Sequence, residues 1–151
     1  MNTKLFVGFK GKNNASSILV KSISENSYFL TNSFEGLKRD IDFLDHSYDC
    51  IILFGIDKNL VDTVRIEKAA EKETKEYSLL DLENISAQLD AVGISNCLSD
   101  KPTHYLCNAA YWYLLRKFNG KVVLIHIPSI KNITGNLIEG LKLVFTNTNN
   151  I

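Results

Sequence analysis

Short apolar runs along the chain alternate with longer segments in which apolar residues recur every three or four positions. The short runs are typical of β-strands, and the periodic segments are typical of helices that bury one face. Gly8 with Gly11 is predicted to end the first strand and Gly55 the third, which is apolar at nearly every position, as in a strand covered on both faces. The predicted strands are residues 4–9, 28–30, 49–54, 94–98 and 121–127.

Helices are predicted where a capping residue precedes an apolar stripe. Residues 61–70 fit no single period. The predicted helices are one capped by Ser16 or Ser17 with Ile18, Leu19 and Ile23 inward, one over residues 34–44 capped by Ser33, one opened by a capping box at Ser78–Asp81 and ended by Gly93, one from about Asn108 to Arg116 and Lys117, and one capped by Thr134.

Strands alternating with helices predict an α/β fold, in which helices cover both faces of a mostly parallel or mixed central sheet as a three-layer α/β/α sandwich. In such folds ligands bind beyond the carboxyl ends of the strands. Gly8, Phe9, Gly55 and His126 are all predicted to lie at such ends. We therefore expect a crevice at this edge of the sheet.

The composition is ordinary for a globular protein, with 45% hydrophobic and 23% charged residues among 151. We expect one domain over residues 1–151, with a frayed tail from about residue 146. Basic and acidic residues both number 17, so no net charge favours nucleic acid or an anionic membrane. No apolar run would span a bilayer, and residues 1–5 lack the apolar core of a signal peptide. Three cysteines make no disulfide framework, which favours a reducing cytoplasm.

Cys107 and His126 are the candidate catalytic pair. Cys107 stands at the start of a predicted helix, where free N–H groups and the helix dipole favour a thiolate. His126 closes an apolar strand just before Pro128, and such an imidazole can act as the base for a thiol nucleophile. Inert packing of Cys107 is the alternative. A metal site made of Cys97, His104, Cys107 and His126 is not expected, because the cysteine spacing matches no compact zinc knuckle.

Several segments occur in an order that matches a known family. Ser99 precedes Tyr105-Leu106-Cys107-Asn108, a helix follows, and His126-Ile127-Pro128 comes next; Val7-Gly8-Phe9 with Asn14-Ala15-Ser16, and then residues 64–70, stand nearer the N-terminus. Together they resemble the pyroglutamyl peptidase I family of cysteine peptidases over nearly the whole chain. The resemblance implies that family's phosphorylase/hydrolase-like fold, and it favours an edge strand or extended turn at residues 61–70.

The resemblance also implies a catalytic triad. Cys107 would be the nucleophile, His126 its base, and Glu67 the residue that orients the imidazole. Glu71, four positions further on, is the alternative carboxylate. Backbone N–H groups of Leu106 and Cys107 would serve as oxyanion donors.

The substrate implied by the resemblance is a small peptide or amide whose N-terminus is a pyroglutamyl residue. Phe9, Tyr105 and Leu106 would line a small apolar pocket for the uncharged lactam, and Ile56 stands at a substrate-binding position. No cofactor or metal is implied, and a homo-oligomer is left open.

The sequence departs from the family on the substrate side. Lys10-Gly11-Lys12 replaces the family's Pro-Phe-Gly-Gly, residues 55–60 replace Gly-Gln-Ala-Gly-Gly-Arg, and Pro102-Thr103 replaces Ala-Gly. The stretch between Ala70 and Tyr77 is also shorter than in members of the family, which have a long loop there. These changes leave two alternatives open: a cysteine hydrolase of the same fold that acts on another small amide, and an inactive homologue that binds a small molecule.

Overall fold

The computed structural model describes residues 3–23, 26–103 and 105–147. The predicted tail beyond residue 147 lies outside this range. The strands are β1 Lys4–Phe9, β2 Ser27–Leu30, β3 Cys50–Ile56, β4 Thr63–Glu67, β5 Ala69–Glu71, β6 Lys75–Tyr77, β7 Ser95–Ser99 and β8 Val122–Ile127. The helices are α1 Ala15–Ile23, α2 Phe34–Asp42, α3 Leu82–Ala91, α4 Leu106–Lys117 and α5 Gly135–Thr146.

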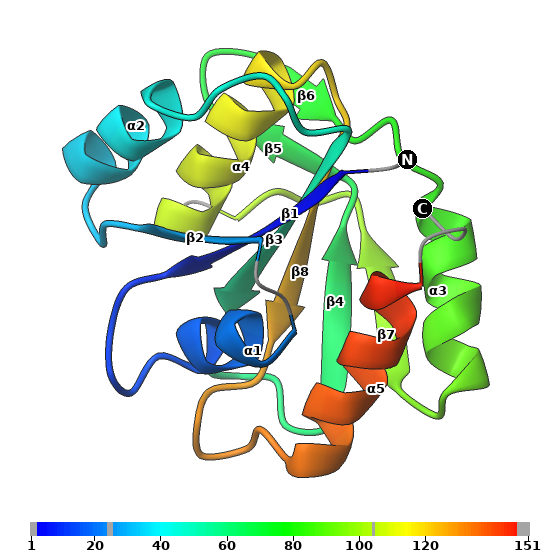
Figure 1. Ribbon diagram of the computed structural model, residues 1–151. Helices are drawn as coiled ribbons and strands as arrows, with labels where there is room; N and C mark the ends of the chain where they lie inside the picture. The colour runs from blue at the N-terminus through cyan, green and yellow to red at the C-terminus, as the bar shows by residue number, and fades with distance from the viewer. Residues whose placement is uncertain (1–2, 24–25, 104, 148–151) are drawn as a thin grey trace.

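The main sheet has six strands in the order β2-β1-β3-β8-β4-β7, and β5 pairs with β6 in a separate hairpin. Neighbours in the main sheet run parallel except β8 and β4, which are antiparallel. Helices α1, α3 and α5 cover one face, and α2 and α4 cover the other (Figure 1). The predicted three-layer fold with a mostly parallel mixed sheet is therefore confirmed. In the parts of the chain that the structure describes, no helix combines the length and apolar content needed to cross a bilayer.

Alternation along the strands sends successive side chains into two separate cores. In β3, Ile52 and Phe54 pack beneath α1 and α5, whereas Leu53 faces α2 and α4. In β8, Leu124 lies in the core beneath α2 and α4. Because His126 is two residues further on, its side chain points to the same face as α4.

The prediction of an edge strand or turn at residues 61–70 is wrong. β4 lies inside the sheet, between β8 and β7. Val64 and Ile66 are fully buried beneath the helices of one face, so Arg65 and Glu67 point to the other. Polar residues occupy every second position within β4, but the longer stretch 61–70 follows no single period. The charged stretch that follows forms the β5–β6 hairpin.

Two predicted helix caps are confirmed and two are wrong. Ser33 and Thr134 each accept a backbone N–H from the first turn of their helix. The cap of α1 is Asn14, whose side chain accepts two N–H groups of the first turn. Asp81 itself caps α3, because the hydroxyl of Ser78 donates instead to a carbonyl of β8.

Gly8 lies within β1 rather than at its end. A Cβ at this position would stand 2.9 Å from the carbonyl oxygen of Ser16 and 3.1 Å from the side chain of Val20. The missing side chain therefore lets α1 lie close against β1.

We predict that Gly8→Ala destabilises the protein by about 1–3 kcal/mol, because the added methyl meets backbone that cannot move freely. Gly135→Ala is the matched control, since an added Cβ there has no heavy atom within 4 Å among the described residues. It should stay within about 1 kcal/mol of the wild type. Urea unfolding of both variants measures the difference, and equal stabilities would contradict the close approach of α1.

Candidate active site

Three residues in register across the sheet define the candidate active site. Gly55 of β3 is paired with His126 of β8, and His126 is paired with Arg65 of β4. Gly55 is the second-last residue of β3, although the sequence predicts that it ends the strand. The row lies at the carboxyl ends of β3 and β8, where ligands bind in sheets of this kind.

The sulfur of Cys107 occupies the space that a side chain at Gly55 would fill. A Cβ built on Gly55 would lie 2.5 Å from Cys107 Sγ and 3.4 Å from Cδ2 of the His126 ring. Residues paired across neighbouring strands hold their side chains side by side. The thiol is thus inserted beside the imidazole, on the same face of the sheet.

The first turn of α4 carries the thiol to this position. Cys107 is the second residue of the helix, after the N-cap Tyr105. The side chain of Asn108 ties this turn to β5: its Oδ1 accepts the N–H of Glu71 at 3.0 Å, and its Nδ2 donates to the carbonyl of Glu71 at 2.7 Å. Ala109 and Ala110 are small and buried, which allows the turn to lie close to the sheet.

Glu67 lies beside the imidazole, and Glu71 does not. Nδ1 of His126 is 2.9 Å from Oε1 of Glu67, and the two residues are 3% and 2% exposed. The hydroxyl of Tyr111 donates to the carbonyl oxygen of Glu67 at 2.8 Å, which fixes the backbone there. Glu71 is exposed, and it contacts α4 through the hydrogen bond from its backbone N–H to Asn108. Of the two carboxylates that the sequence left open, the structure brings Glu67 to His126.

Arg65 connects two carboxylates next to the ring. Its Nε lies 2.5 Å from Oε1 of Glu67, and its Nη2 lies 2.9 Å from Oδ2 of Asp57 and 3.4 Å from Nδ1 of His126. Burial alone would lower the pKa of the guanidinium, but the hydrogen bonds to both carboxylates raise it above its usual value. Burial would raise the pKa of Asp57, but hydrogen bonds from the Asn59 N–H and from Arg65 lower it. Arg65 and Asp57 are therefore both charged.

A cavity of about 450 Å³ opens beside the thiol. It is lined by Cys107 and His126 and, among others, by Asp57, Lys58 and Arg65. The sequence predicts an apolar pocket, and the lining of this cavity combines apolar surface with three charged side chains. The charged side chains are present because the loop after β3 supplies Asp57 and Lys58 and because β4 turns Arg65 to this face.

Two of the four predicted substrate-binding residues line this cavity. Ile56 lines it while packing partly against the core beneath α1 and α5. Tyr105 also lines it and is 78% exposed. Phe9 and Leu106 are not among its lining residues: Phe9 is buried in the core beneath α2 and α4, and Leu106 packs against that core.

The thiol of Cys107 is neutral at ordinary pH. Burial of the sulfur raises the pKa of Cys107 to about 11. Backbone N–H groups of Ile56 and Cys107 act in the opposite direction, and the carboxylates of Glu67 and Asp57 raise the pKa further. The N–H groups favour a thiolate, as expected for a helix start, but desolvation outweighs them in the protein without substrate.

Two backbone N–H groups face the sulfur. They belong to Cys107 and Ile56. The N–H of Asp57 donates to Ile127 of β8. Since successive N–H groups point to opposite sides of a strand, that of Ile56 points away from β8 and is free to face the sulfur.

The remaining cysteines lie away from this cavity. Cys50 is buried in the core, and Cys97 is exposed on β7. His104, considered as a metal ligand, lies outside the described residues. Among the described residues, no group of three or more histidine, cysteine, aspartate or glutamate side chains is placed to hold a metal ion.

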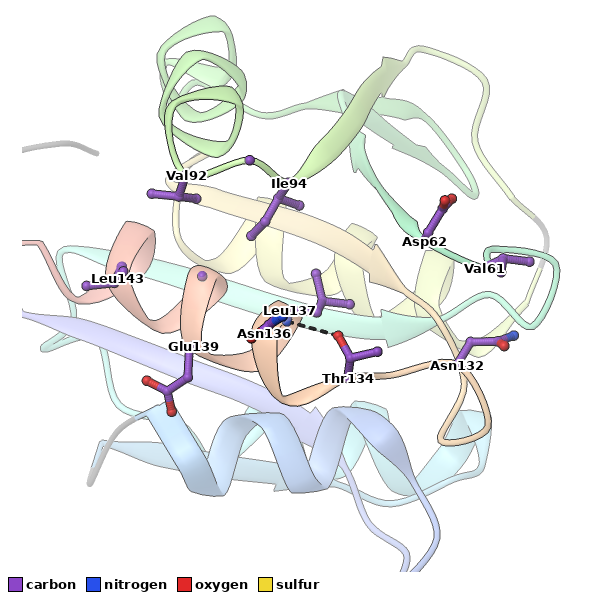
Figure 2. Close-up of a pocket in the computed structure, with 12 residues that line it drawn as sticks. Val61, Asp62, Val92, Ile94, Asn132, Thr134, Asn136, Leu137, Glu139 and Leu143 are labelled. Atoms are coloured by element: carbon purple, nitrogen blue, oxygen red, sulfur yellow. Dashed lines mark hydrogen bonds between the residues drawn. The ribbon is translucent and has the colours of Figure 1, made fainter.

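A second cavity lies between α5, the turn after α3 and the loop before β4 (Figure 2). Its lining includes Val61, Ile94 and Leu143 together with Asp62 and Glu139. It contains no cysteine or histidine among its lining residues. Cys107 and His126 line the first cavity instead.

Arg65 and Asp57 are the members of the site that the sequence did not single out as functional. The strict alternation of apolar and polar residues at 63–67 is the signal that could have identified Arg65, because it places Arg65 and Glu67 on one face. Nothing comparable indicates Asp57, which reaches Arg65 from a loop.

Comparison by sequence gives no match, either to a model of a known protein family or to a curated protein. Comparison with solved structures does give matches. The chain is similar to the pyrrolidone carboxyl peptidase from Thermococcus litoralis, with 18% identity, 96% of this chain and 92% of that chain covered, and a TM-score of 0.76.

Two further solved structures agree. The pyroglutamyl peptidase I of Bacillus amyloliquefaciens has 16% identity, 95% of each chain covered and a TM-score of 0.78. The pyrrolidone carboxyl peptidase of Thermus thermophilus has 14% identity, 94% of this chain and 97% of that chain covered, and a TM-score of 0.77. The chain therefore has the fold of the pyroglutamyl peptidases over almost its whole length.

Proposed function

We propose that the protein is a cysteine peptidase that removes an N-terminal pyroglutamyl residue from small peptides. The observation that carries the proposal is the insertion of Cys107 Sγ beside the ring of His126 at Gly55, in a cavity open to a ligand. Cys107 is the nucleophile, His126 the base, and Glu67 the residue that orients the base.

The first step forms an acyl-enzyme. Because Nδ1 of His126 faces Glu67, the ring takes the thiol proton at Nε2 while the sulfur attacks the acyl carbon. The C=O electron pair moves to oxygen, and the resulting oxyanion is stabilised by the N–H groups of Cys107 and Ile56. The tetrahedral intermediate collapses as the C–N bond breaks, and His126 gives its proton to the leaving amine.

The second step hydrolyses the thioester. His126, neutral again, takes a proton from water, whose oxygen attacks the acyl carbon. The C–S bond then breaks, the acid is released, and the proton returns to the sulfur. Because the thiol is neutral at rest, its deprotonation accompanies the attack on the substrate.

The charged cavity favours a second candidate function. Asp57, Lys58 and Arg65 line the space where an uncharged lactam would sit, and charged groups suit a polar or charged acyl group better. A cysteine hydrolase with the same residues in the same roles, acting on another small amide, is the alternative.

We expect the wild type to hydrolyse a pyroglutamyl reporter amide and Cys107→Ala to have no measurable activity. Cys97→Ala, which removes an exposed cysteine on β7, should keep wild-type activity. His126→Ala should lose on the order of 10²-fold or more in kcat. Activity that survives in Cys107→Ala would reject the proposed nucleophile.

Parallel assays with free aminoacyl reporter amides separate the two candidate functions. Faster turnover of an aminoacyl amide than of the pyroglutamyl amide would favour the alternative. Failure of the wild type to hydrolyse either kind of amide would favour an inactive homologue.

We expect alkylation of Cys107 by iodoacetamide to speed up by about tenfold per pH unit between pH 7 and 9, because only the thiolate reacts and its pKa is raised. Peptide mapping by mass spectrometry measures Cys107 and Cys97 in the same sample, so Cys97 serves as the internal control. A rate for Cys107 that is already constant below pH 7 would indicate a thiolate at rest and would contradict this mechanism.

A further inference from the structure

Arg65 is a charged residue of the cavity that the proposed triad leaves without a role. It stands directly opposite His126 in the pairing of β4 with β8. Its guanidinium contacts Glu67, Asp57 and His126 itself. A cation that touches both the orienting carboxylate and the base is placed to act on the proton transfer.

Glu67 makes both of its side-chain hydrogen bonds through one oxygen. Oε1 lies 2.5 Å from Nε of Arg65 and 2.9 Å from Nδ1 of His126. Oε2 is buried and has no hydrogen-bond partner among the described residues. A buried polar side chain with few hydrogen bonds depends strongly on each of them for its position. Arg65 therefore supplies one of the two hydrogen bonds that fix the Glu67 side chain against the ring.

The guanidinium also acts on the ring directly. Its Nη2 lies 3.4 Å from Nδ1 of His126, and a positive charge at that distance disfavours the imidazolium. The described titratable or charged groups around the ring are Arg65 and Glu67 from β4, Asp57 and Lys58 from the loop after β3, and Cys107 and Tyr105 from the start of α4.

We propose that Arg65 is a positioning residue: it holds Oε1 of Glu67 against Nδ1 of His126 and, as a fixed cation, favours the neutral imidazole that accepts the thiol proton. This inference rests on the proposed function, in which His126 is the base. The neutral thiol of Cys107 requires such a base, because a ring that is already protonated could not accept its proton. Asp57 holds Arg65 in turn through Nη2.

The test follows the titration of the His126 ring by NMR in the wild type, Arg65→Gln and Arg65→Lys. The ring resonance is assigned by its loss in His126→Ala. We expect Arg65→Gln to raise the titration midpoint by about one pH unit, since a charge within about 4–6 Å shifts such midpoints by about 1–3 units. Activity lost near neutral pH should then return in part at higher pH.

Arg65→Lys separates charge from geometry. It should keep the midpoint within about 0.3 units of the wild type, because the charge remains. Its pH-independent kcat on the reporter amide should fall on the order of tenfold, because an amine cannot reproduce the fork that contacts Glu67 and Asp57 together. In a Glu67→Gln background, Arg65→Gln should change this kcat by less than about twofold, since its partner is already lost.

An unchanged midpoint in Arg65→Gln, or a wild-type kcat in Arg65→Lys, would overturn the inference. Arg65→Met, of similar volume, replaces the glutamine variant if circular dichroism shows that the latter is unfolded. The titration needs no substrate. If the wild type hydrolyses neither kind of amide, the proposed function is rejected. A midpoint that still shifts in Arg65→Gln would then show that Arg65 acts on the ring all the same.

Discussion

The candidate site depends on the absence of a side chain at Gly55. The backbone of β3 lies so close to the start of α4 that a methyl group would overlap the sulfur of Cys107. Because Gly55 is paired in register with His126, the vacant position lies next to the imidazole, and α4 fills it with the thiol. A thiol and its base thus come together through strand register and helix packing, although they are far apart in the chain.

The reversed direction of β4 determines which charges surround the base. Running antiparallel to β8, it places Arg65 opposite His126 and Glu67 two pairs further along, opposite Leu124. Both side chains therefore point to the face of α4, while Val64 and Ile66 fill the core on the other side. The same five-residue alternation supplies the orienting carboxylate and the cation beside it. It also adds a charged side chain to the cavity lining, beside the apolar groups that the family resemblance implies.

Much of the fold could be predicted from the sequence, because apolar runs and helical periods are local properties. The position of β4 could not, since its two charged residues, Arg65 and Glu67, are unusual in a strand inside a sheet, and neighbours in a sheet are set by tertiary packing. Cys107 and His126 stood out through their positions at the ends of elements. The contact of Arg65 with Asp57 joins a strand to a loop, and no local pattern encodes it. The protonation state of the Cys107 thiol depends on desolvation, which arises only when the folded chain removes water from the sulfur.

The most direct test is the activity of Gly55→Ala on the hydrolysed reporter amide, with Gly135→Ala as the control for adding a methyl group. The added Cβ would lie 2.5 Å from Cys107 Sγ and 3.2 Å from its Cβ, so the thiol must move away from His126. The account predicts that kcat falls on the order of 10²-fold in Gly55→Ala, as for a displacement of about 1 Å, and stays at the wild-type level in the control. A Gly55→Ala protein with wild-type kcat would contradict it.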